Sequence, residues 1–341
     1  MKHLKWKAGL VTGVVCVGLA GLALSGCASS PKAETEPANA APATHTATLH
    51  RGYAAAHGEN AFAQVVVATA EDGSILGVNV DEYQFTPKAS GAVGVPNSDA
   101  KFGAQIINDS VLMSKTDNNE MYSKMMKDKA QATQPWLTSM QAIESFAKGK
   151  MPADLTKASG PDAVSGATLV DTANYLKAIA TVAKSSDVTS EGTYTGDGAD
   201  LKIGRTLAKA HGESAICSAV TLVQGDTIVA TNIDEFQFMA STTAGIVPVP
   251  NSDKGLAKSI VEGSVLASKA LNNTSYSEML KTKGNATQPW LTSMQAIESY
   301  VAGKTPADAG KAKGPDAVSG ATLVDTAGYI QAATAAAATA A

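Results

Sequence analysis

Two copies of one short motif hold the residue types best suited to chemistry in this sequence. The motif reads Asp-Ala-Val-Ser-Gly-Ala-Thr and ends at Thr168 in the first copy and at Thr322 in the second. Its small residues let a ligand approach the backbone closely, and its last residue supplies a hydroxyl group. We expect the turn to lead directly into a helix, whose unpaired N–H groups and positive dipole end favour a phosphate. The residues expected to form this site are Asp162, Ser165, Gly166, Ala167 and Thr168, and Asp316, Ser319, Gly320, Ala321 and Thr322.

The same string also has a simpler interpretation. Short strings with serine or threonine are common at helix starts, where the side chain caps the first turn. A single copy would favour that interpretation. Two identical copies, each with an aspartate six residues before the threonine, favour a shared function, although recent duplication also produces identity.

An internal duplication organises the elements that must position the motif. Residues 132–145 recur letter for letter as 286–299, an offset of 154, and residues 160–173 recur at the same offset. Each repeat has the size of a domain. We therefore expect an α+β protein with two tandem domains of similar fold, residues 46–186 and 190–335, each an antiparallel sheet with helices.

Hairpins and helices are predicted within each repeat. The β-prone runs 64–69 and 74–80 flank a Glu-Asp-Gly turn, which predicts a hairpin, and the second copy repeats it around residues 224–226. The Ala- and Thr-rich end, residues 332–341, has helix propensity without an apolar pattern, so we expect it to fray. The segments predicted to be helical are 136–146, 169–182 and, as one or two helices, 110–129.

Trp136 and Trp290 occupy identical Gln-Pro-Trp-Leu-Thr-Ser-Met segments. A tryptophan ring could cover a flat aromatic cofactor by stacking, so both residues are candidate cofactor contacts. The alternative is a proline at a helix start with the tryptophan packed in the core.

Two repeated histidines, His57 and His211, are each followed at two residues by a glutamate, Glu59 and Glu213. One histidine and one glutamate in each repeat give two ligands, fewer than the three or four protein ligands that a metal usually needs. We therefore expect surface or turn residues and no metal site.

The Asp-Glu pairs at 81–82 and 234–235 are candidate acid–base carboxylates. Since Asp and Glu are seldom fully buried, we expect both pairs to be solvated at a strand end.

Composition excludes several classes of function. The chain is 44% hydrophobic and 17% charged, as in globular proteins, and its formal charge of -4 with no basic stripe argues against a nucleic-acid partner. Beyond residue 27 the sequence contains one cysteine, Cys217, which lies among apolar residues. A lone thiol cannot form an internal disulfide, an iron–sulfur cluster or a c-type haem site, so we expect Cys217 to be a core residue.

The N-terminus has the pattern of a bacterial lipoprotein signal. Three lysines precede an apolar run, residues 8–24, which leads into Leu-Ser-Gly-Cys ending at Cys27. A plain transmembrane anchor would not require a cysteine there. We expect residues 1–26 to be removed, Cys27 to carry lipid, and residues 27–45 to form a disordered tether at the extracytoplasmic face of the cell membrane.

The motif Asp-x-x-Ser-Gly-Ala-Thr resembles the flavinylation motif of FMN-binding domains, such as those of the sodium-pumping NADH:quinone reductase and of Rnf-type complexes. Every fixed position is matched in both copies. In that family an ApbE-type FAD:protein FMN transferase attaches FMN to the last threonine through a phosphoester bond. The resemblance implies two covalent FMN groups, on Thr168 and Thr322, and assigns Asp162 and Asp316 a part in modification or local structure.

In its lipoprotein signal, polar tether and tandem motifs, the chain resembles lipoproteins of flavin-based extracellular electron transfer. This resemblance implies a redox carrier that passes electrons from a membrane quinone-linked NADH dehydrogenase to iron(III) or another terminal acceptor. Such a carrier needs no substrate pocket, so an enzymatic activity does not follow from the resemblance.

Two alternatives remain open. One is a flavin-dependent reductase of an organic substrate, but the chain has only two arginines, Arg51 and Arg205, with which to clamp a carboxylate. The other is a cofactor-free, duplicated binding or adhesion lipoprotein, in which the two motif threonines are ordinary helix-start residues.

Overall fold

The strands and helices of the two repeats follow one another in the same order in the computed structural model, which describes residues 42–186, 189–284 and 286–340. The lipoprotein signal, Cys27 and the tether up to residue 41 lie outside these residues. The predicted tether, 27–45, extends too far, because Thr44 and His45 already belong to the first strand and pair with residues 194–195. The first repeat contains β1 (Thr44–Ala54), β2 (Ala61–Ala70), β3 (Ile75–Pro87), β4 (Ser110–Ser114), α1 (Asn119–Ala130), α2 (Trp136–Ala147), α3 (Pro152–Leu155) and α4 (Thr172–Val182).

The second repeat adds one strand before the same series. It contains β5 (Thr189–Thr195), β6 (Leu201–Ala208), β7 (Ala215–Gln224), β8 (Thr227–Ala240), β9 (Ser264–Ser268), α5 (Asn273–Gly284), α6 (Trp290–Val301), α7 (Pro306–Ala309) and α8 (Thr326–Ala338). Four short 3-10 turns complete the described elements. None of the described helices combines the length and apolar character needed to cross a bilayer.

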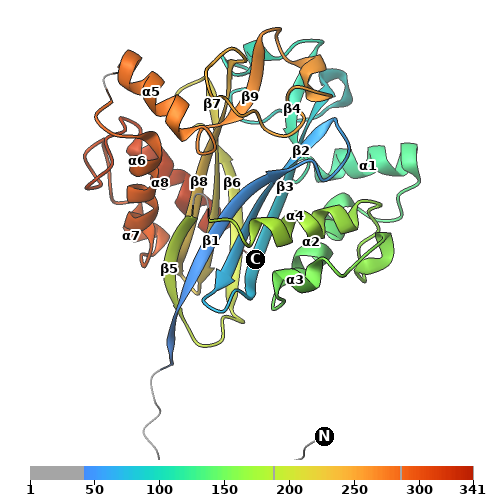
Figure 1. The fold of residues 1–341 in the computed structure, drawn as a ribbon, viewed down its shortest axis with the longest axis horizontal. Helices are drawn as coiled ribbons and strands as arrows, with labels where there is room; N and C mark the ends of the chain where they lie inside the picture. The colour runs from blue at the N-terminus through green and yellow to red at the C-terminus, as the bar shows by residue number, and fades with distance from the viewer. Residues whose placement is uncertain (1–41, 187–188, 285, 341) are drawn as a thin grey trace, which may run out of the picture. The chain divides into compact units, whose positions relative to one another are not determined.

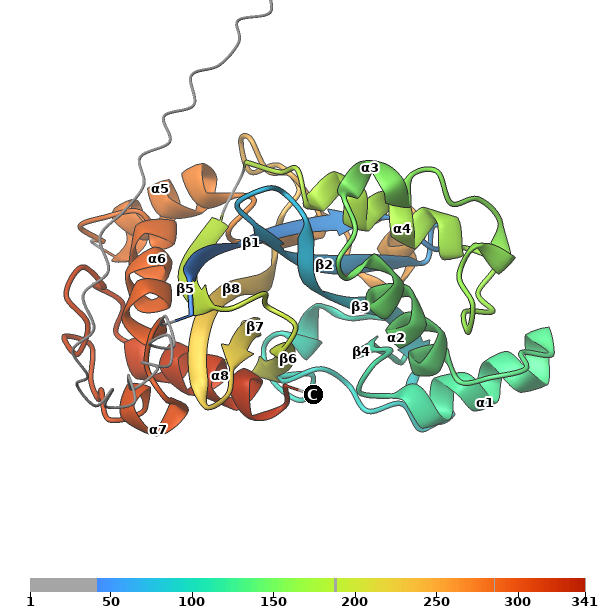
Figure 2. The ribbon, with the colours of Figure 1, turned by 90° about the horizontal axis from the view of Figure 1, so that it is seen from below.

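Two antiparallel sheets lie at the centre, with α1–α4 on one side and α5–α8 on the other (Figures 1 and 2). The strand orders are β4-β3-β2-β1-β5 and β6-β7-β8-β9. The strand β5 precedes the second repeat in sequence but pairs with β1 of the first, with Leu49 opposite Ser190. The α+β class and the antiparallel sheets with helices agree with the sequence prediction.

Both faces of each sheet are buried. One face packs against the helices of its own repeat. The other face packs against the sheet of the other repeat through two apolar clusters, each built from residues of both repeats. This explains why β2 and β7 are almost continuously apolar and buried, without the alternation of a half-exposed strand. The described residues form one compact unit.

Loop contacts also join the repeats. The side chain of Asn97 donates to the carbonyl oxygens of Gly212 and Ala215, and Asn251 makes the equivalent bonds to Gly58 and Ala61. The same contact made in both directions shows that the repeats are related by an approximate two-fold arrangement.

Three sequence expectations need correction. Residues 110–114 form the strand β4 and not a helix, because the buried run Val-Leu-Met pairs with the far end of β3. The C-terminal segment does not fray up to Ala338, because α8 buries Ala332, Ala333 and Ala336 against the sheet. The Asp-Glu pairs are not solvated, since β3 and β8 continue past them and both faces of each strand are covered.

Candidate functional site

The motif lies in an exposed loop that its apolar residues fix to the core. Val164 and Ala167 are buried, whereas Ser165, Gly166 and Thr168 are exposed. Gly166 has φ 85°, a left-handed conformation that favours glycine, and the equivalent Gly320 has φ 86°. The loop therefore presents the threonine to solvent on a backbone of defined shape.

The prediction that this loop runs directly into a helix is wrong. The helix α4 begins at Thr172, four residues after Thr168, and Asp171 occupies its N-cap position. Between them, Leu169 is buried and its carbonyl oxygen accepts from the backbone N–H and the hydroxyl of Thr172. This extra turn separates the motif from the helix dipole, so Ser165 and Thr168 do not cap α4.

The motif loop rests instead on the first turns of α2. The backbone N–H of Thr168 donates to the hydroxyl of Ser139 at 3.2 Å, and the two hydroxyl oxygens lie 3.3 Å apart. The Gln134 amide donates to the carbonyl oxygen of Gly166 at 2.6 Å and to Ser139 Oγ at 2.5 Å. Ser139 is fully buried, so it holds the exposed threonine on a fixed support.

The second copy has the same contacts. Thr322 N–H donates to Ser293 Oγ at 3.3 Å, with the hydroxyl oxygens 3.5 Å apart, and Gln288 donates to Gly320 and Ser293. Sequence reasoning missed this glutamine and serine. Their signal was present, because the two segments repeated letter for letter, 132–145 and 160–173, are those that touch each other.

Side chains of α1 already accept from the first backbone N–H groups of α2. The backbone N–H of Trp136 donates to Ser123 Oγ, and that of Leu137 donates to Asn119 Oδ1. These side chains therefore satisfy two of the N–H donors that a phosphate at a helix start would otherwise bind. The support that α2 gives to the motif is therefore the Ser139 and Gln134 contact, and not an open helix terminus.

Both tryptophans lie in the core. Trp136 is 1% exposed and meets Tyr122 edge to face, with ring centroids 6.4 Å apart. Trp290 is also 1% exposed and packs on Tyr276 in the same way. As placed, neither indole ring offers a solvent-facing surface for stacking.

Beside each tryptophan lies a buried ion pair that sequence reasoning did not find. Lys115 Nζ is 3.0 Å from Glu82 Oε2, Tyr175 donates to the same carboxylate, and the ammonium lies 4.4 Å from the Tyr122 ring centroid. Burial, reinforced by the charge of Glu82, raises the pKa of Tyr175 well above its usual value. The tyrosine therefore stays protonated and acts as a donor.

The second repeat has the equivalent pair. Lys269 Nζ lies 2.5 Å from Glu235 Oε2, and Tyr329 donates to that carboxylate at 2.9 Å. Burial opposes the charge on Lys269, but Glu235 and Tyr276 together outweigh it, so the pKa of Lys269 is raised. The ammonium is charged at neutral pH.

The repeated histidines pair with aspartates and not with Glu59 or Glu213. His57 Nδ1 lies 2.6 Å from Asp171 Oδ2, and His211 lies at the same distance from Asp325. Among the described residues, no group of three or more histidine, cysteine, aspartate or glutamate side chains is arranged to hold a metal ion. Cys217 is fully buried, in agreement with a core role.

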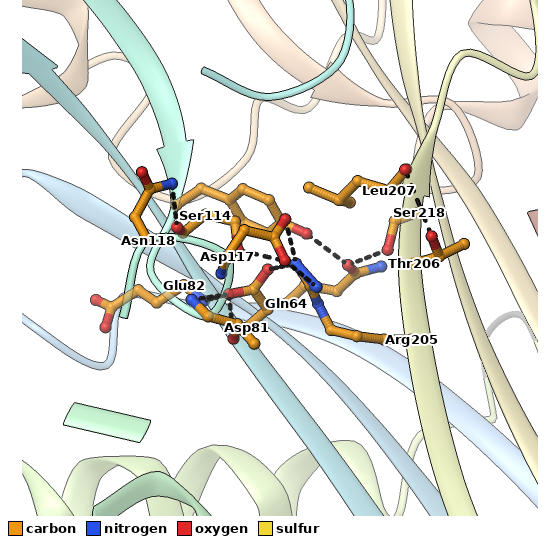
Figure 3. A network of polar contacts seen from close by, with 12 residues as sticks. Gln64, Asp81, Glu82, Ser114, Asp117, Asn118, Arg205, Thr206, Leu207 and Ser218 are labelled. Atoms are coloured by element: carbon orange, nitrogen blue, oxygen red, sulfur yellow. Dashed lines mark hydrogen bonds and ion pairs between the residues drawn. The ribbon is translucent and has the colours of Figure 1, made fainter. Parts of the chain in front are cut away.

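The two arginines connect the repeats. Arg205 of β6 lies 2.5 Å from Asp81 and 2.8 Å from Asp117, both in the first repeat (Figure 3). In the reverse direction, Arg51 of β1 donates to Asn232 and to the carbonyl oxygen of Ile233. Both guanidinium groups are thus engaged in contacts between repeats.

Comparison with protein-family models, with curated proteins and with solved structures gave no match for this chain.

Proposed function

We propose that this chain is a lipid-anchored, extracytoplasmic electron-transfer flavoprotein that carries FMN covalently on Thr168 and Thr322. The observation that carries the proposal is the presentation of these two hydroxyls. Each lies in an exposed, glycine-shaped loop and is held by a buried serine through the same pair of contacts.

The residues around each threonine fit a tethered phosphoester. The neighbouring serine, glycine and alanine of the motif are small, so a transferase and its substrate meet little bulk there. An exposed valine follows each threonine by two positions: Val170 is 78% exposed and Val324 is 74% exposed. These side chains offer apolar surface beside each attachment residue, and an aromatic cofactor ring could pack against that surface.

In this proposal Ser139 and Ser293 orient the threonine, and Gln134 and Gln288 hold the loop. FMN, when bound, accepts one or two electrons, which allows a two-electron donor to supply a one-electron acceptor. A covalent bond keeps the cofactor on a protein that works outside the cytoplasm, where a dissociated flavin would be lost by dilution.

The remaining parts of the proposal follow from the resemblance and the N-terminal sequence. Cys27 carries the lipid anchor, an ApbE-type transferase adds the flavin, a quinone-linked membrane dehydrogenase supplies electrons, and iron(III) or another acceptor removes them. In this proposal the two flavins supply the redox chemistry.

The test is the intact mass of the chain produced with and without a flavin transferase. We expect two FMN-sized additions in the wild type, one in Thr168→Val or Thr322→Val, and none in the double variant. Thr156→Val, at another exposed threonine of the first repeat, should keep both additions. A wild-type chain that gains no mass would overturn the proposal in favour of a cofactor-free binding lipoprotein.

A further inference from the structure

The strand β5 shows how an added strand fits on one repeat. It extends the first sheet along β1, with residues 44–50 paired to residues 189–195, and it packs over β8 and α6. The approach is close at Gly192, where a Cβ atom would lie 1.7 Å from the carbonyl oxygen of Val229. Only a residue without a side chain fits at this crossing.

The two-fold arrangement predicts an equivalent position for an added strand on the second sheet. By the offset of 154, residues 44–50 of β1 correspond to residues 198–204, of which 198–200 belong to the turn before β6 and 201–204 form its start. In the described part of the chain β6 is an edge strand and no strand pairs with its outer side. Thr339 bonds both the N–H and the carbonyl oxygen of Arg205, which closes the edge just beyond this stretch.

A cleft of about 830 Å³ lies along this open edge. One wall is β3, residues 76–80, another is α2, including Leu137, Gln141 and Glu144, and the third is β6 itself. These are the counterparts of β8 and α6, against which β5 packs in the other half. The cleft is therefore the space that a strand equivalent to β5 would fill.

A lysine partly occupies the place of the absent strand. Lys148 Nζ donates to the carbonyl oxygens of Ala199 and Leu201 at 3.1 Å and 2.9 Å. The offset places Ala302 at the equivalent position of the second repeat, where β5 is present. Lysine is a common protection of exposed strand edges, and here it satisfies the carbonyl oxygen of Leu201, which a partner strand would otherwise bond.

We propose that the β6 edge is a docking site for an extended segment of a partner protein, which adds antiparallel to residues 201–204 as a fifth strand. Main-chain bonds supply the affinity in such strand addition, and alternate side chains supply the specificity. Lys202 lines the cleft and is exposed, so it favours an acidic residue in the segment. By analogy with Gly192, the segment needs a glycine where it crosses β3. The strand β5 itself, Thr-Ser-Glu-Gly-Thr-Tyr-Thr, has these properties.

The test uses the full chain and a fluorescent peptide with the sequence of residues 189–195. We expect saturable binding by anisotropy, with slowed hydrogen exchange at the Ile203 amide. Ile203→Pro removes this outward N–H together with an isoleucine side chain that packs between the sheets, whereas Ile203→Ala removes the side chain alone. We expect Ile203→Ala to bind the peptide and Ile203→Pro not to bind it, because proline is tolerated on strand edges but cannot donate to the added strand. Lys148→Met frees the Leu201 carbonyl group for the added strand and should tighten binding about five-fold, the ratio for one hydrogen bond.

Controls separate this surface from other effects. Lys202→Glu should weaken binding, whereas Lys157→Met, at an exposed lysine outside the cleft, should leave it unchanged. No binding by either the wild type or Lys148→Met would overturn the proposal. It would also fall if the Ile203 amide were already protected without peptide, because the chain would then fill its own edge.

Discussion

Arg205 in β6 lies 2.5 Å from the carboxylate of Asp81 in β3, so the second repeat neutralises a buried charge of the first. Asp81 is 1% exposed and also accepts from the backbone N–H of Glu82 and from the hydroxyl of Thr116. Figure 3 shows the guanidinium group between Asp81 and Asp117. The stability of the first repeat thus depends on a side chain of the second.

Removing Arg205 should destabilise the whole described unit. Arg205→Met leaves Asp81 buried without its cation, and breaking a buried pair in this way costs about 3 kcal/mol. Urea unfolding measures the loss. The double variant Arg205→Met/Asp81→Asn should recover part of it, and equal stability of the two variants would contradict the assigned pairing.

The buried pair of the second repeat gives a separate prediction. Lys269→Met should lower the free energy of unfolding by about 3 kcal/mol because Glu235 is left buried without its partner. Lys269→Met/Glu235→Gln should restore much of this, since Tyr329 can still donate to the amide oxygen. Additive effects of the two substitutions in a double-mutant cycle would argue against coupling.

The serine below each acceptor threonine should control flavin attachment at its own site. Ser139→Ala removes the group that accepts the Thr168 N–H and should slow FMN addition at Thr168 by about five-fold, the ratio for one hydrogen bond. Addition at Thr322 serves as the internal reference, and Ser293→Ala should reverse the preference. Peptide mapping after timed incubation with the transferase measures both sites, and equal rates in both variants would show that the serines do not position the threonines.

A buried glutamate should make stability depend on pH. Glu298 is 3% exposed and burial raises its pKa to about 8, so the folded state holds a proton that the unfolded chain releases at its ordinary, lower pKa. This stabilisation is complete below the unfolded pKa and is lost as pH rises toward 8. The decline is at most about 1.4 kcal/mol per pH unit for this group.

Glu298→Gln isolates that contribution, because its amide oxygen can still accept from the Ile233 N–H. Urea unfolding between pH 5 and 8 should show a shallower decline in this variant than in the wild type. Glu278→Gln, at an exposed position, serves as the control. An unchanged slope in Glu298→Gln would assign the pH dependence elsewhere.

Local patterns predicted the hairpins and α2, because turn residues and helical spacing act over a few positions. They failed where a distant segment decides the outcome. The strand β4 is five residues long and is defined by its pairing with β3, and Asp81 is buried because the other repeat covers its face of the sheet. The Ser139–Thr168 contact joins residues 29 positions apart, which single-segment periodicity cannot show.

The reciprocal arginines have an evolutionary consequence. A chain with one repeat would expose the apolar sheet face that now meets the other repeat, and its arginine would lack an acceptor. Two copies of such a chain could satisfy both needs only as an isologous homodimer, with each arginine bonded across the subunit boundary. The present protein has the architecture of such a dimer joined into one polypeptide, in which each repeat can carry substitutions that the other lacks.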